Sequence, residues 1–270
     1  MPVASPNEAI CGYTGPYAAL VADEVKQGIS VQMLVGDVSA GLAVPLRFRV
    51  CRKPQETPVD DLQVEHEKLM HVIGVREDLG GFFHFHPRRS APGLWEMIHT
   101  FTNGGRYQVW SDIKQQGTLY SFAHPRLTVS GPLASRPRDF IPKLVDEKAG
   151  YRITLQSAGP LEAGRTNSLE IFVRDAFGAP VATGNFLGAL MHLIVIKDDV
   201  SVYLHAHAQS HARTAWPVAF NQVFPRPGNY KLFAQFRPLK SKLPPDEAVL
   251  AEFWVKVGMS RLTRAEDSPR

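Results

Sequence analysis

Six of the ten histidines fall into two similar arrangements along the chain. In each arrangement a Met-His pair is followed, after a short turn, by a His-x-His motif. The residues are Met70-His71 with His84 and His86, and Met191-His192 with His205 and His207. Neutral imidazole binds zinc, copper and nickel, and a nearby thioether shifts the preference toward Cu(I). These residue types predict a metal ion as ligand, with copper the first expectation and zinc the second.

The histidines can meet only if the segments that carry them are strands. In an extended strand His84 and His86 project from the same face. If the two strands of the first copy pair so that Val75 faces Phe82, His71 lies opposite His86. Directly opposed Cβ atoms are roughly 5 Å apart, which brings three imidazoles within reach of one ion. A register slip of one residue would move His71 to the other face and remove the third ligand.

Other residues near the motifs are open to more than one interpretation. Met70 and Met191 neighbour a histidine in sequence, so their side chains point away from it in a regular strand. Asp78 and Asp199 are expected to shape the hairpin turns. Domain one has additional candidate ligands without counterparts in the second copy, namely His66, Met97 and His99. The alternative to a metal site is a hydrogen-bonded network of structural histidines.

The two arrangements belong to a longer internal repeat. Leu69–Ile73 matches Leu190–Ile194, and Phe83–His86 matches Leu204–His207, both with an offset of 121 residues. Downstream, Phe101–Tyr107 matches the segment that ends in Tyr230, after a two-residue insertion. A duplicated domain explains this similarity.

Each copy has the pattern of β structure. Leu46, Phe48 and Val50 alternate with polar residues, which is typical of a strand with one buried face. About seven short strands per copy predict an all-β chain of two tandem immunoglobulin-like or cupredoxin-like β-sandwich domains. A short helix is expected over 16–28. The predicted boundaries are an N-terminal extension 1–27, domain one 28–131, a linker 132–148, domain two 149–258 and a polar tail 259–270.

Composition narrows the function classes. Apolar residues make up 44% of the chain and charged residues 21%, as in a globular protein. The net charge of +4 is scattered rather than gathered in a stripe, so we expect no nucleic-acid partner. No apolar run reaches the ~18 residues of a membrane span. Cys11 and Cys51 either form one disulfide or remain two thiols. No leader is visible over 1–11, which leaves cytoplasm and export both open.

No motif of a known catalytic machinery is present. The nucleophile elbow, the phosphate-binding loop and the dinucleotide fingerprint are absent, and nothing beside the histidines suggests a general base. We therefore expect a binding protein rather than an enzyme. Three hypotheses follow: a copper-binding protein, a metal-free immunoglobulin-like interaction or accessory module, and, least favoured, a zinc or copper enzyme.

The motifs also resemble a known group of sequences. The segments His66–His71 and His84–Pro87, with Phe186–His192 and Phe224–Tyr230, are similar to bacterial secreted tandem β-sandwich proteins related to the YtkA-like and FixH-like group. The resemblance implies a periplasmic or secreted protein in a copper-handling or respiratory setting, with a periplasmic or membrane protein as partner. It implies as ligands His71, His84, His86, His192, His205 and His207. One departure is Ala208, where the first copy has Pro87.

Overall fold

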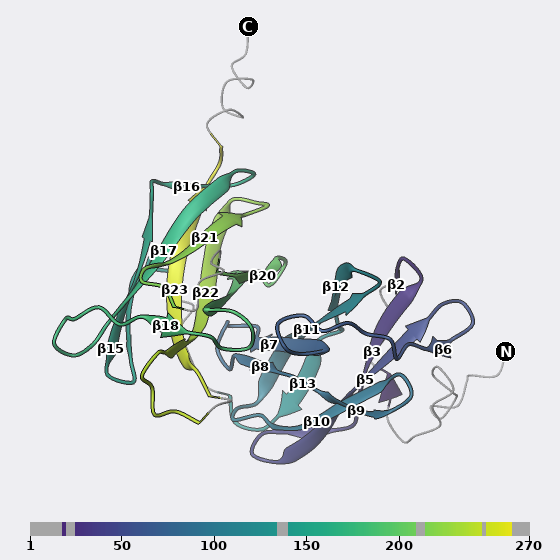
Figure 1. Cartoon of the computed structure of the whole chain (residues 1–270). Coiled ribbons are helices and arrows are strands. Elements are labelled where there is room, and N and C mark those ends of the chain that lie inside the picture. The colour runs from purple at the N-terminus through teal and green to yellow at the C-terminus, as the bar shows by residue number, and fades with distance from the viewer. Residues whose placement is uncertain (1–17, 20–24, 134–139, 209–213, 245–246, 261–270) are drawn as a thin grey trace, which may run out of the picture. The chain divides into compact units, whose positions relative to one another are not determined.

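The computed structural model describes residues 18–19, 25–133, 140–208, 214–244 and 247–260. Within these ranges every regular element is a β-strand (Figure 1). The chain divides into two compact units, residues 1–137 and 138–270. Each unit contains two sheets around its own apolar core, so the predicted all-β fold of two tandem β-sandwich domains is confirmed.

Domain 1 pairs a seven-stranded sheet with a six-stranded sheet. The first has the order β1 (Ala18–Ala19), β3 (Ile29–Val35), β5 (Ala43–Arg52), β10 (Leu94–Thr100) and β9 (Arg88–Ala91), with β2 (Val25–Lys26) on β3 and β6 (Thr57–Pro58) on β5. The second has the order β4 (Val38–Ser39), β13 (Leu127–Ser130), β11 (Gly105–Gln115), β7 (Met70–Arg76) and β8 (Phe83–Phe85), with β12 (Thr118–Ala123) on β11.

Domain 2 repeats this plan with fewer strands in its first sheet. That sheet has the order β14 (Val145–Lys148), β15 (Tyr151–Ser157), β17 (Thr166–Arg174) and β21 (Val218–Val223). The second has the order β16 (Leu161–Glu162), β23 (Val249–Gly258), β22 (Gly228–Pro238), β19 (Met191–Lys197) and β20 (Tyr203–His207), with β18 (Thr183–Gly184) on β22.

The strand order is that of an immunoglobulin-like sandwich. In immunoglobulin letters, β3, β5, β10 and β9 are A, B, E and D, and β4, β13, β11, β7 and β8 are A′, G, F, C and C′. Each domain also has a tyrosine corner at the start of strand F. Tyr107 donates its hydroxyl to the Asn103 carbonyl at 2.9 Å, and Tyr230 donates to the Arg226 carbonyl at 2.7 Å.

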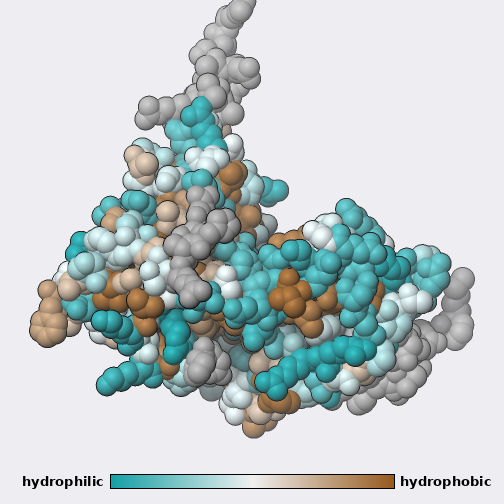
Figure 2. All heavy atoms as spheres, viewed as in Figure 1, coloured by the Kyte–Doolittle hydropathy of each residue, from teal (hydrophilic) through white to brown (hydrophobic). Residues whose placement is uncertain are grey.

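The cores follow from the period-two patterns. Leu46, Phe48 and Val50 on β5 have no exposed surface, and neither do Leu169 and Ile171 on β17. Burying a side chain of this size stabilises a fold by roughly 1.5–3 kcal/mol. The face of the molecule in Figure 2 is mainly hydrophilic, with apolar residues in small separate patches.

Two expectations about local structure need correction. Ala18–Ala19 and Val25–Lys26 are strands, so the helix expected over 16–28 does not form there, and 16–17 and 20–24 lie outside the described residues. Val145–Lys148, expected in the linker, forms β14 and pairs with β15 through a tight turn. Both central residues of that turn, Ala149 and Gly150, have positive φ. Alanine at such a position is uncommon, so the residue type does not predict a turn there.

Cys51 is fully buried on β5 and takes part in a disulfide. The other cysteine of the chain, Cys11, lies outside the described residues.

Candidate metal centres

Both domains have the strand register that brings their three histidines onto one face. In domain 1, β7 and β8 pair Ile73 with His84 and Val72 with Phe85, which sets His71 opposite His86. In domain 2, β19 and β20 pair His192 with His207 and Ile194 with His205. Each set of three histidines therefore shares one face of its sheet, as predicted.

The ring nitrogens of each set converge. In domain 1, Nδ1 of His71 lies 3.2 Å from Nε2 of His84 and 3.2 Å from Nε2 of His86. In domain 2, Nδ1 of His192 lies 3.3 Å from Nε2 of His205. The ring of His207 is centred 4.8 Å from that of His192 and 4.6 Å from that of His205.

In both clusters the candidate ligand atoms lie within 4.8 Å of one another. One histidine of each cluster is buried and two are half-buried. We refer to the cluster of His71, His84 and His86 as site 1, and to that of His192, His205 and His207 as site 2.

A backbone carbonyl fixes the proton on the buried histidine of each site. Nε2 of His71 lies 2.9 Å from the carbonyl oxygen of Glu65, and Nε2 of His192 lies 3.0 Å from that of Phe186. A carbonyl only accepts hydrogen bonds, so Nε2 carries the proton and donates it. The lone pair on Nδ1 is then directed at the other two rings. Metal-binding histidines are commonly oriented by such a partner on their second nitrogen.

Each of these carbonyls is held by a strained turn. Residues 65–68 and 186–189 close by paired backbone hydrogen bonds between their first and last residues. The central residues have positive φ: 47° and 64° at His66 and Glu67, and 51° at Leu187. Residues other than glycine rarely adopt this conformation, and it persists only where surrounding contacts hold it.

The segment before each turn is attached to strand F in the same way in both copies. Gln63 pairs with Lys114 on β11, and Gly184 pairs with Arg237 on β22. In domain 1 a salt bridge of 2.6 Å between Lys114 and Glu65 adds to this attachment. The hydrogen bond from Lys114 lowers the pKa of the Glu65 carboxyl. The carbonyl that orients the buried histidine is therefore placed by the sheet itself.

The additional candidate ligands lie elsewhere. Met70 and Met191 belong to the apolar cores of their domains, on the opposite face of the sheet from the histidines. His99 packs against Phe83, Phe85 and Phe101, where burial lowers its pKa.

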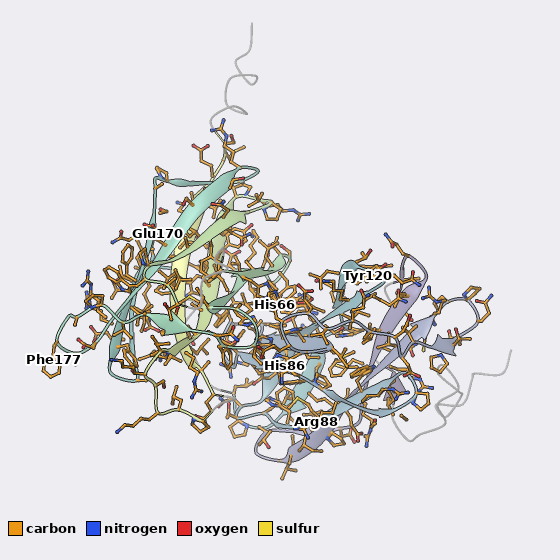
Figure 3. All side chains as sticks on the ribbon, in the orientation of Figure 1. His66, His86, Arg88, Tyr120, Glu170 and Phe177 are labelled. Carbon is orange, nitrogen blue, oxygen red and sulfur yellow. The ribbon has the colours of Figure 1, made fainter. Side chains whose placement is uncertain are left out.

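Two further candidates are also accounted for. Met97 packs at the edge of the domain 1 core. His66 is on the strained turn, with Nε2 3.4 Å from a Glu65 carboxylate oxygen, outside the three-histidine cluster (Figure 3).

Two aspartates have the turn-forming role that we expected. Asp78 accepts hydrogen bonds from the Gly80 backbone and from the Arg76 side chain, and Asp199 accepts from the Ser201 backbone. Sequence reasoning missed the carbonyls of Glu65 and Phe186. Their positions do match across the repeat at the same offset, and that match was the only available signal.

The distances between nitrogens suit a small metal ion. A metal–nitrogen bond of about 2.0–2.1 Å and tetrahedral angles place neighbouring nitrogens about 3.3 Å apart. The observed values of 3.2 and 3.3 Å agree with this geometry. Three neutral nitrogen donors leave one coordination position for water, a second ligand or a ligand from a partner. Imidazole donors suit zinc, copper, iron and nickel.

The fold and the sites together define a class of protein: tandem immunoglobulin-like β-sandwiches with a three-histidine cluster on the C–C′ hairpin of each domain. The model of one family, a domain of unknown function (DUF8832), matches residues 23–130 and again residues 145–258. The chain belongs to this family, and the two matches coincide with the two domains.

Other comparisons are distant. No curated protein matches the chain. Among solved structures, Escherichia coli alpha-2-macroglobulin in its native conformation is 10% identical, with 87% of this chain and 14% of that chain covered and a TM-score of 0.27. The mouse nectin-like molecule 4 ectodomain is 13% identical, with 82% and 65% covered and a TM-score of 0.21. None of these scores supports a functional assignment. Among the described residues no helix is long and apolar enough to cross a bilayer.

Proposed function

We propose that the protein binds one transition-metal ion in each domain, at site 1 and at site 2, and that the ion is copper, with zinc as the alternative. We further propose that it acts outside the cytoplasm, where it exchanges the ion with a periplasmic or membrane protein. The motif resemblance to YtkA-like and FixH-like proteins supports the location and the partner. The geometry of the sites supports the metal.

One observation carries the proposal. Nδ1 of His71 has a single lone pair, and Nε2 of His84 and Nε2 of His86 both lie 3.2 Å from it. One lone pair accepts one well-aligned hydrogen bond, so a metal-free network would leave one of the two contacts poorly satisfied. An ion at the centre instead takes one lone pair from each ring. The same arrangement recurs in domain 2, from strands with the same register.

The donor set favours an exchangeable ion over a structural one. Structural zinc sites are closed by four protein ligands, commonly with thiolates, whereas sites 1 and 2 each offer three imidazoles. Two histidines of each site are half-buried, and this partial exposure supports access of a partner to the bound ion. Transfer by ligand exchange requires such access.

Metal titration of the purified apo-protein tests the proposal. Cu(I), Cu(II) and Zn(II) are added separately, with a competing chelator to measure affinity and with bound metal counted per chain. We expect two ions per chain for the wild type and one for the double variants His84→Ala/His86→Ala and His205→Ala/His207→Ala. The quadruple variant should bind none. Metal at 100 times its Kd should stabilise the domain that binds it by about 2.7 kcal/mol.

His99→Phe is the matched control, because it removes a histidine from domain 1 outside site 1 and leaves an aromatic ring among aromatic neighbours. It should leave the stoichiometry at two. No uptake by the wild type, or uptake unchanged in the quadruple variant, would refute the proposal. A metal-free interaction module with structural histidines would then be the remaining explanation.

A further inference from the structure

We infer that the two sites are chemically unequal: site 1 selects a divalent ion, whereas site 2 selects Cu(I). This inference rests on the proposed metal-binding function and adds which charge state each site prefers. It follows from two differences between the surroundings of the two sites, one on strand F and one on the turn that carries the orienting carbonyl.

The first difference is a charge on strand F. Asp112 on β11 is the register partner of His71, and Gln235 on β22 is the register partner of His192. Register partners project from the same face with Cβ atoms about 5 Å apart. Asp112 is 2% exposed, so solvent screens its charge weakly. Site 1 therefore has a carboxyl group beside its buried histidine, and site 2 has a neutral amide at the same position.

The second difference is the polarity of the turn. In domain 1 the turn reads Glu65-His66-Glu67-Lys68, and in domain 2 it reads Phe186-Leu187-Gly188-Ala189. The Phe186 ring is buried and centred 6.0 Å from the ring of His192, in an edge-to-face arrangement. Site 2 is thus bordered by apolar groups where site 1 is bordered by ionisable ones.

Two lysines on strand F are paired with carboxylates. Lys231 on β22 lies 2.8 Å from Glu252, and Lys114 on β11 lies 2.6 Å from Glu65. Each of these pairs is neutral as a whole. Beside the buried histidine, strand F thus has an acid in domain 1 and an amide in domain 2, and this is the difference that the inference uses.

Because of these differences, the two sites should prefer ions of different charge. The cost of moving an ion from water into a poorly polar site grows with the square of its charge, whereas the attraction of a carboxylate grows only in proportion to the charge. A neutral, apolar site with three imidazoles is thus least unfavourable for a soft monocation such as Cu(I). An adjacent carboxylate attracts a dication such as Zn(II) or Cu(II) more strongly than a monocation, and so offsets more of the transfer cost of the dication.

The experiment uses the full chain with one site removed at a time. His205→Ala/His207→Ala leaves site 1, and His84→Ala/His86→Ala leaves site 2. The affinities of each protein for Zn(II) and, under anaerobic reducing conditions, for Cu(I) are measured by chelator competition. We expect the ratio of Zn(II) affinity to Cu(I) affinity to be at least about tenfold higher for site 1 than for site 2.

Exchange of the strand F residues isolates the cause. Asp112→Asn in the protein that retains site 1 should lower Zn(II) affinity about tenfold and change Cu(I) affinity by less than about threefold. Gln235→Glu in the protein that retains site 2 should raise Zn(II) affinity by a similar factor. Thermal unfolding of each apo-variant verifies that it is folded.

The inference would be overturned if the ratio of Zn(II) affinity to Cu(I) affinity were equal at the two sites. It would also be overturned if Asp112→Asn lowered both affinities equally and Gln235→Glu raised neither. Metal binding itself would stand in both cases. Absence of binding at both sites would instead refute the proposed function, and this inference with it.

Discussion

The buried histidine of the domain 1 core should make that domain acid-sensitive. His124 lies in the short segment between β12 and β13, where its Nε2 is 2.9 Å from Oγ of Ser111 and its ring packs on Phe48. Complete burial lowers the pKa of His124 from 6.5 to about 3. The folded domain therefore keeps this ring neutral at pH values where the unfolded chain binds a proton.

The sign and size of the effect follow from proton linkage. The contribution of His124 is fully present above pH 6.5, where neither state binds the proton, and it is lost as the pH falls from 6.5 toward 3. The gap between the two pKa values corresponds to about 5 kcal/mol over the whole range. Between pH 7.5 and pH 5 the expected loss is about 2 kcal/mol, since the unfolded state is then protonated and the folded state is not.

Domain-resolved hydrogen exchange measures this loss. The opening free energy of the slowest amides of β11 is compared at pH 7.5 and pH 5 in chelator, for the wild type and for His124→Gln, whose amide can still bond to Ser111. The wild type should lose about 2 kcal/mol more than the variant. Groups common to both proteins cancel, including His99, whose pKa is also lowered. Equal pH dependence in the two proteins would show that the reasoning is wrong.

Two further predictions test packing and coordination. A Cβ on Gly74 would lie 2.1 Å from Cζ of Phe83, and the matching pair in domain 2 is Val195 with Leu204. Gly74→Ala should therefore destabilise domain 1 by about 1–3 kcal/mol in chemical denaturation, with Phe83→Leu restoring part of the loss. Gly159→Ala, where no atom lies within 4 Å, is the control. X-ray absorption of the metal-loaded protein should show nitrogen neighbours at about 2.0 Å and no sulfur, because Met70 and Met191 face the cores. The packing prediction is wrong if Gly74→Ala/Phe83→Leu is as unstable as Gly74→Ala. The coordination prediction is wrong if the absorption spectrum shows a sulfur neighbour.

Much of the candidate site could be predicted from the sequence because strand geometry is nearly rigid. His84-x-His86 and His205-x-His207 share a face in any extended strand, and the short turn before them leaves few possible registers. The duplication supports the prediction of a site, because the same three histidines occur twice at one offset. The placement of both methionines in the cores also follows from their positions beside a histidine on the same strand.

Other features could not be read from residue types. Every residue has a backbone carbonyl, so the residue type does not indicate that the carbonyl of Glu65 or of Phe186 orients a histidine. The turn that holds it has positive φ at His66 and Glu67, which are not turn-forming residues by composition. Likewise, the turn after β14 depends on Ala149 at positive φ, which the residue type does not indicate.

The sequence by itself determined the two domains, the alternation that builds their sheets and the shared face of each His-x-His pair, because these depend on the internal repeat and on local periodicity. Only the tertiary structure decided which carbonyls orient the buried histidines, and that Asp112 and Gln235 stand beside them on strand F. Those relations join segments far apart in the chain, and they arise from how loops and neighbouring strands pack rather than from the repeat of any residue pattern.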